Sequence, residues 1–141
     1  MKYVQGRLWN FITRDNALKV SQQMYYGNSY VESDLVNSYM WDTAIVYIQA
    51  MGNSNYAYTV SPGSGLMNTG ERGDERCKIM DMAGNIQEWS TEYSTSSVHC
   101  VQRGGEFTNS NSFAATRESA NGATSSSYGD RQGFRVGLYI K

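Results

Sequence analysis

Two carboxylates bracket a short turn in the segment Asp81-Met82-Ala83-Gly84-Asn85-Ile86-Gln87-Glu88-Trp89. Gly84 or Asn85 can adopt a positive φ at little steric cost, so the chain can reverse direction there. Such a loop can turn both carboxylates and several backbone carbonyls towards one point, which suits the oxygen-rich shell that Ca²⁺ prefers. The alternative is that Asp81 and Glu88 bind loop amides and arginines and hold no ion.

Two further signatures combine arginine with glycine, Arg103-Gly104-Gly105 and Gly133-Phe134-Arg135. Glycine within a strand lets another backbone approach closely. We expect the phenylalanine to lie in the core. We expect the two arginines to pair with buried acids, Glu88 or Glu106, rather than to contact a substrate.

The sequence contains no common catalytic constellation. It lacks the Gly-x-Ser-x-Gly elbow, the phosphate-binding loop and zinc-type spacing. Its single histidine, His99, stands in a stretch typical of a surface loop or strand edge. Cys77 and Cys100 lack metal-type spacing, and although they could face each other across strands, we expect free thiols.

Composition narrows the class of protein. A length of 141 residues fits one domain, 1–141. A net charge of -1 predicts no binding to nucleic acid, and no apolar run is long enough for membrane insertion. The first residues lack the apolar core of a signal peptide. The 11 tyrosines, with abundant Ser, Asn and Gly, are typical of adaptable binding surfaces, although the same small residues also mark a loop-rich domain.

Two helices are expected in the first half of the chain. Apolar residues recur at helical spacing through the first 24 residues, within an N-terminal helical segment 1–34. Asn37 can cap a second helix that ends near Met51. Residues 52–75 carry few apolar residues and many turn residues, which predicts a long surface insertion. The apolar stripe of the second helix consists of Met40, Trp41, Ala44, Ile45 and Ile48.

Short strands are expected in the second half, at Ile79, over 86–89 and over 101–107. We expect Trp89 to anchor its strand in the core. The final segment, 134–140, alternates with period two, which predicts one inward-facing row. That row would consist of Phe134, Val136, Leu138 and Ile140. Helices followed by short antiparallel strands and long loops make an α+β fold.

The segment 106–132 contains almost no aliphatic residue larger than alanine, so it cannot form a core of its own. Because it lies between two ordered signatures, we interpret it as a displayed surface that is held at both ends.

In their order along the chain, these signatures resemble the C-terminal half of the formylglycine-generating enzyme (sulfatase-modifying factor) family. The resemblance covers roughly residues 35–141. It implies a C-type-lectin-like fold in which two helices pack on short antiparallel strands with long loops. It also implies a structural Ca²⁺ whose ligands would be the side chains of Asp81 and Glu88 and the carbonyls of Gly84 and Ile86.

The sequence departs from that family where the enzyme performs its chemistry. The enzyme requires two cysteines just after the Gly-Gly pair, because thiolates bind the copper that activates oxygen. Asn109 and Ala114 occupy these positions, so we expect no copper and no formylglycine formation. Iron-dependent relatives require a set of histidines, and with His99 alone we expect no iron.

The resemblance therefore favours a non-enzymatic binding module that displays 106–132 on a C-type-lectin-like scaffold. The layout also resembles the variable proteins of diversity-generating retroelements, which phage tails and bacterial surfaces use. We accordingly expect a protein or glycan ligand on a cell surface, and location on a phage particle or bacterial cell surface. The expected contact residues are Phe107, Asn109, Asn111, Phe113, Tyr128, Arg131 and Gln132.

Two alternatives stay open. One is an enzyme with a repurposed site on the same scaffold, which would gather Asn109, Arg117 and Tyr128 around a pocket with a perturbed carboxylate. The other is a structural or assembly domain that forms a homo-oligomer through the N-terminal helix. A large uncovered apolar patch on residues 1–24 would favour it.

Overall fold

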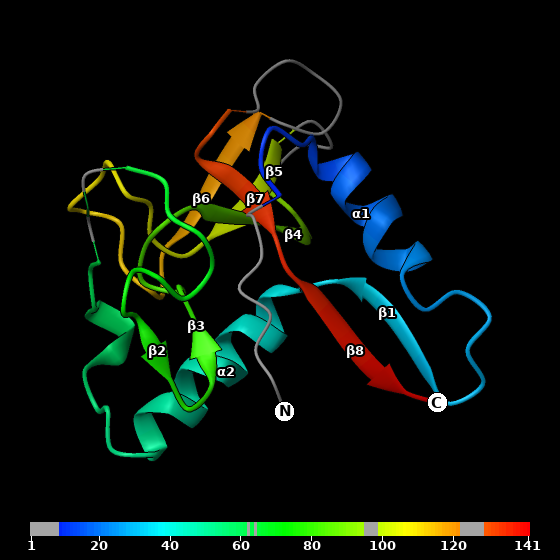
Figure 1. Cartoon of the computed structure of the whole chain (residues 1–141), viewed down its shortest axis with the longest axis horizontal. Coiled ribbons are helices and arrows are strands. Elements are labelled where there is room, and N and C mark those ends of the chain that lie inside the picture. Colours follow the sequence, from blue (N-terminus) through cyan, green and yellow to red (C-terminus); the bar gives the residue numbers. More distant parts are fainter. Residues whose placement is uncertain (1–8, 62, 64, 95–98, 122–128) are drawn as a thin grey trace.

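Two α-helices and a set of short strands form an α+β fold in the described part of the chain (Figure 1). The computed structural model describes residues 9–61, 63, 65–94, 99–121 and 129–141. Among them, no helix is long and apolar enough to cross a membrane. The elements are α1 (Arg14–Gln23), β1 (Val31–Leu35), α2 (Ser38–Ala50), the 3-10 turn η1 (Tyr56–Tyr58), β2 (Glu75–Arg76), β3 (Ile79–Met80), β4 (Gln87–Tyr93), β5 (His99–Arg103), β6 (Arg117–Asn121), β7 (Gln132–Phe134) and β8 (Val136–Ile140).

The first helix begins at Arg14 and is capped by Thr13, whose side-chain oxygen accepts the Asn16 amide hydrogen at 3.3 Å. This capping bond fixes the start of α1 and leaves residues 9–13 outside the helix. The predicted helix over the first 24 residues is therefore wrong for 9–13, and residues 1–8 lie outside the described part. Apolar spacing was misleading here because Ile12 is buried from a non-helical segment.

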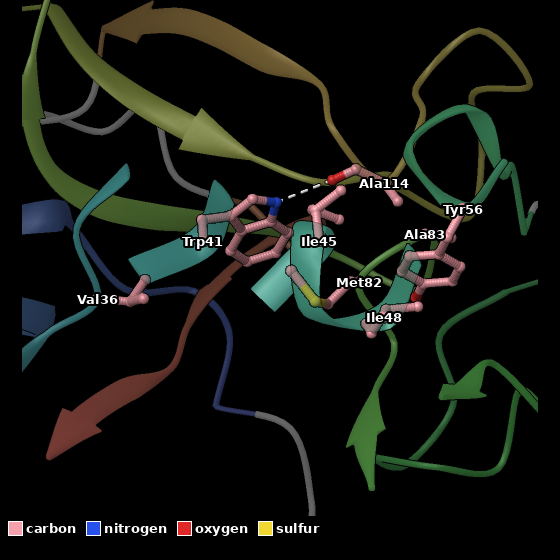
Figure 2. Close-up of a cluster of buried hydrophobic side chains, with 8 residues drawn as sticks. All are labelled: Val36, Trp41, Ile45, Ile48, Tyr56, Met82, Ala83 and Ala114. Carbon is pink, nitrogen blue, oxygen red and sulfur yellow. Dashed lines mark hydrogen bonds between the residues drawn. The ribbon is translucent and has the colours of Figure 1, made fainter. Parts of the chain in front are cut away.

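The second helix confirms its prediction. The Asn37 side chain accepts the Met40 amide hydrogen at 2.8 Å, which caps α2. Trp41 is 1% exposed, and its indole N–H donates to the carbonyl of Ala114 at 2.9 Å (Figure 2). The helix thereby holds the segment that follows the Gly-Gly pair. The core cluster on this side contains Val36, Trp41, Ile45, Ile48, Tyr56, Met82, Ala83 and Ala114.

The central sheet has the strand order β6-β5-β4-β7. Glu88 of β4 lies opposite Arg103 of the antiparallel β5 and opposite Gly133 of the parallel β7. All three sequence signatures therefore meet on β4. Trp89 is fully buried and donates to the Ile12 carbonyl at 2.9 Å, which confirms its expected role as the anchor of this strand.

The predicted inward row of the last strand is wrong beyond its start. The strand breaks at Arg135, and β8 leaves the central sheet to pair with β1 in an antiparallel ribbon. Leu138 and Ile140 are 52% and 92% exposed. The buried face is the opposite one, because Gly137 packs so closely on Met40 that an added Cβ would lie 2.6 Å from its methyl carbon.

The segment 52–75, predicted as a surface insertion, also contributes to the core. Tyr56 is 2% exposed, and its hydroxyl donates to both oxygens of Asp74, at 3.0 and 2.9 Å. Asp74 also accepts the Ala83 amide hydrogen at 2.7 Å. The prediction was wrong at these two residues because a tyrosine and an aspartate can be buried together when each satisfies the other.

Candidate functional site

The loop 81–89 is buried along its whole length. Asp81 and Asn85 have positive φ values of 59° and 73°, so the turn expected at Gly84 or Asn85 occurs at Asn85. The Asn85 side chain fixes a neighbouring loop, because it accepts the Met67 amide hydrogen at 3.1 Å and donates to the Met67 carbonyl at 3.0 Å. The loop is thus part of the interior, and the Asn85 side chain forms hydrogen bonds with another segment of the chain.

Glu88 is bound by an arginine. Arg135 donates to Glu88 from two nitrogens, with the Nη2–Oε1 distance at 2.6 Å, and also donates to the Met80 carbonyl at 3.1 Å. Its guanidinium carbon lies 5.0 Å from the centre of the Trp41 ring. This pairing of Arg135 with Glu88 was predicted and is confirmed.

The other arginine pairs differently from the prediction. Arg103 binds Asp42 of α2, and the expected acid Glu106 instead forms an ion pair with Arg131, with nitrogen and oxygen 3.5 Å apart. The reason is geometric, because the Arg103 side chain extends from β5 to Asp42 in α2. These two residues are 61 positions apart in sequence.

Asp81 carries the least satisfied carboxylate of the loop. Its Oδ2 accepts the Gly70 amide hydrogen at 2.8 Å, while its Oδ1 is buried with no hydrogen-bond partner among the described residues. Burial raises the pKa of Asp81 above its ordinary value. An unpaired buried oxygen of this kind is a suitable ligand for a cation.

The four expected calcium ligands differ in how free they are. Asp81 offers its unpaired oxygen, whereas Glu88 would have to share its carboxylate with Arg135. Gly84 and Ile86 lie in the same buried loop and could contribute only carbonyls. Within the described ranges, no group of three or more His, Cys, Asp or Glu side chains is placed to hold a metal. The calcium site stays a prediction.

The segment after Gly105 is held to the loops beneath it by backbone hydrogen bonds. Phe107 donates its amide hydrogen to Asn85 at 3.0 Å, and its carbonyl accepts from Gly63 at 3.1 Å. Ala114 donates to Thr59 at 2.9 Å. Gly105 itself allows this close approach, because an added Cβ would lie 2.2 Å from the Ala83 carbonyl oxygen.

Between these fixed points, side chains of the segment 107–116 alternate irregularly between solvent and core. Ser112 and Ala114 are buried, and Ala114 has no exposed area. Phe113 is 39% exposed and meets the ring of Tyr58 edge-on, with ring centres 6.4 Å apart. The exposed polar positions are Thr108, Ser110 and Asn111.

The predicted contact residues that the structure describes differ in their exposure. Asn111 is exposed, while Asn109 and Phe107 are half-buried. The Asn109 side chain accepts the Asn111 amide hydrogen at 2.9 Å, which stabilises the turn. Arg131 is exposed and donates to Thr108 at 3.3 Å, so the two ends of 106–132 do meet.

Of the remaining predicted contacts, Gln132 makes a structural hydrogen bond and Tyr128 is not described. The Gln132 side chain accepts the Gly129 amide hydrogen at 2.8 Å and is half-buried. Tyr128 lies outside the described residues. Sequence reasoning missed Thr108 and Tyr58, since only the fold brings Tyr58 beside Phe113.

The two cysteines are separate and free. Cys77 packs against the core cluster that contains Trp41, whereas Cys100 belongs to the cluster around Trp89. Asn109 and Ala114, where the resemblance implies that the enzyme's cysteine pair would stand, serve the turn and the core, respectively. Of the alternative site around Asn109, Arg117 and Tyr128, Arg117 pairs with Glu92, and Tyr128 lies outside the described residues, so this alternative stays a prediction.

Comparisons with known proteins bear on family and fold. The family model described as a sulfatase-modifying factor enzyme 1-like domain matches residues 16–138. No curated protein matches the chain. Among solved structures, Treponema denticola variable protein 1 is similar, with 17% identity and a TM-score of 0.54 over 76% of this chain. The chain spans about half of that structure's length, 47%, so this likeness concerns the fold alone.

Proposed function

Because the chain belongs to the family of sulfatase-modifying factor enzyme 1-like domains, we propose that it is a non-catalytic member that binds a ligand through the segment 106–132. In this proposal the scaffold is the C-type-lectin-like fold that the family resemblance implies. The α+β arrangement and the structural likeness to a variable protein support it.

One observation carries the proposal: exposed side chains project from a backbone that the interior fixes. Thr108, Ser110 and Asn111 are exposed, while backbone hydrogen bonds from Phe107 to the buried loop 81–89 and from Ala114 to Thr59 hold both flanks. A fixed backbone lowers the entropy that binding would otherwise cost, and small polar residues beside aromatic rings are effective contacts.

The residues that replace the enzyme's cysteines support a role without oxidative chemistry. Asn109 and Ala114 cannot supply thiolates, and Ala114 is held in the core by the indole of Trp41. No copper or iron is expected in the function proposed here.

The segment further suggests diversification by a retroelement. Its exposed positions can change without loss of buried contacts, and a protein named as a variable protein has a similar fold. The ligand would then be a protein or glycan on a cell surface, and the chain would act on a phage particle or bacterial surface. A structural Ca²⁺ at Asp81 would stiffen the loop beneath the displayed segment.

Sequencing the gene and its neighbourhood in several closely related isolates tests this proposal. We expect substitutions to concentrate at the exposed positions Thr108, Ser110, Asn111 and Phe113, while Ser112 and Ala114 stay unchanged. A near-copy of the stretch and a reverse transcriptase gene should lie nearby. Substitutions spread evenly over the whole surface would contradict diversification, and identity throughout 106–132 would indicate a fixed ligand.

A further inference from the structure

A charged cleft lies where the start of α2 meets the strands β4, β5 and β6. Its volume of about 400 Å³ falls within the range of roughly 300–1,000 Å³ that is typical of small-ligand sites. The side chains that define its chemistry are Ser38, Tyr39, Asp42, Glu92, Arg103 and Arg117.

Two ion pairs line this cleft. Asp42 pairs with Arg103, and Glu92 accepts from Arg117 Nε at 3.0 Å. The hydroxyl of Ser38 also donates to Glu92. The hydrogen bonds from Arg117 hold the pKa of Glu92 below its ordinary value, so Glu92 is ionised at neutral pH. Two positive and two negative charges therefore face the same space, and they cancel.

Arg103 is the fixed part of the cleft. Its side chain is 4% exposed, and its Nε is buried with no hydrogen-bond partner in the part of the chain that the structure describes. This nitrogen has almost no exposed surface, so it does not contact a ligand in the cleft. Arg103 instead contributes a guanidinium group that burial and the bond to Asp42 hold in place at the cleft lining.

The alternation of charges restricts what a ligand of the cleft can be. An anion would have to displace Asp42 or Glu92 from its arginine, although both carboxylates are tethered to the protein. A cation would have to displace the tethered arginines in the same way. A ligand that leaves both pairs intact must be neutral, must donate to the carboxylates and must accept from the guanidinium groups. Hydroxyl groups do both, and such charge-assisted hydrogen bonds are strong.

The rim of the cleft provides an apolar surface beside these charges. Tyr39, in the first turn of α2, is 86% exposed. A second, shallower hollow shares Tyr39 with the cleft and continues along the helix over Met40, Ala44 and Tyr47. An exposed ring next to polar groups suits a ligand that has hydroxyl edges and a C–H face.

We propose that this cleft binds a neutral sugar unit of a glycan, whose hydroxyl groups bridge the two ion pairs and whose ring lies on Tyr39. The proposal goes beyond the displayed segment 106–132, with which the cleft shares only Arg117. It stands whether or not that segment binds a ligand.

A titration followed by NMR tests the site. The full ¹⁵N-labelled chain receives four neutral methyl glycosides in turn, the glucoside, galactoside, mannoside and N-acetylglucosaminide. Sodium acetate and sodium sulfate serve as anionic probes. We expect at least one glycoside to shift the amide signals of Ser38, Asp42 and Arg117 in a saturable way, and neither salt to do so.

A pair of tyrosine variants then locates the binding. Tyr39→Ala removes the exposed ring and should weaken binding of the active glycoside by about fivefold. Tyr26→Ala is the matched control, because Tyr26 is 90% exposed and lies in the turn after α1, away from the cleft lining. Both substitutions remove exposed rings and should leave the fold intact, and the control should bind as the unaltered chain does.

Three results would overturn the proposal. The first is that none of the four glycosides gives a saturable shift at the cleft. The second is that acetate or sulfate shifts the same signals more strongly, which would reassign the cleft to an anion. The third is that Tyr26→Ala and Tyr39→Ala weaken binding equally. Because Asn111 and Phe113 lie outside the cleft lining, failure here leaves the display proposal for 106–132 to its own test.

Discussion

The loop 81–89 and the segment 107–116 are joined by a hydrogen bond between Asn85 and Phe107, yet they use their side chains in opposite ways. Every residue of the loop is buried, and its charges bind other protein groups. The segment buries only some of its side chains and exposes the rest. The interior therefore restricts residue type throughout the loop, but only at the buried positions of the segment.

Breaking the buried ion pair should have the largest effect. Glu88→Gln leaves the partly buried guanidinium of Arg135 without the carboxylate that binds it, which should lower the free energy of unfolding by about 2–3 kcal/mol. Urea denaturation in excess chelator measures this loss without any contribution from calcium. The matched control is Glu92→Gln, which breaks a more exposed pair and should cost about 1 kcal/mol or less. Similar losses in both variants would contradict the contrast between buried and exposed pairs.

A second substitution tests the buried positions within the segment itself. Ala114→Leu forces three additional carbons against Trp41 and should cost about 1–3 kcal/mol. Asn111→Ala, three positions earlier and exposed, should change the free energy of unfolding by less than about 0.5 kcal/mol. Thermal denaturation of both variants checks this difference. Equal costs would mean that the exposed positions are also structurally constrained.

Binding of calcium should have a smaller effect on stability than either of these substitutions. If Ca²⁺ binds Asp81 and the neighbouring carbonyls, saturating ion should raise the melting temperature by about 4 °C, the shift that roughly 1 kcal/mol produces in a domain of this size. A modest effect is expected because Glu88 is already neutralised by Arg135. The measurement is differential scanning fluorimetry with calcium and then with excess chelator. An unchanged melting temperature would remove the ion from the proposal.

The smallest expected effect is the contribution of Asp81 to the pH dependence of folding stability. Burial raises the pKa of Asp81, so just above the ordinary pKa of an aspartate the folded state retains a proton that the unfolded state has released. The stability that this proton provides is present at lower pH and declines as the pH rises through the raised pKa. Asp81→Asn should remove the decline. In chelator, we expect the unaltered chain to lose stability relative to this variant as the pH rises above the ordinary pKa of an aspartate. A difference in stability between the two chains that does not change with pH would contradict this prediction.

Local sequence signals predicted the elements whose determinants lie close together in the chain. The Asn37 cap, the apolar face of α2 and the strand anchored by Trp89 all follow from neighbouring residues. The Glu88–Arg135 pair could be predicted because both residues belong to recognisable motifs.

The remaining features depend on partners that are distant in sequence. Nothing near Arg103 indicates that its acid would be Asp42, because the choice depends on how α2 packs against the sheet. The face of β8 was mispredicted since the absence of a side chain at Gly137, rather than the apolar row, decides which side approaches Met40. The cleft that joins Asp42, Glu92 and Arg117 is invisible in the sequence for the same reason.

The pairing of β1 with β8 also has a consequence for how the chain folds during synthesis. Residues 31–35 can pair only after residues 136–140, which lie about a hundred positions later in the chain, have left the ribosome. At roughly 5–20 residues per second, this delay lasts about 5–20 s. During this time residues 31–35 lack their strand partner, and unpaired strand segments invite association between nascent chains. Because β1 and β8 are far apart in sequence, their pairing adds contacts of high contact order that form late. Conditions that slow translation therefore lengthen the time during which the unpaired segment can aggregate.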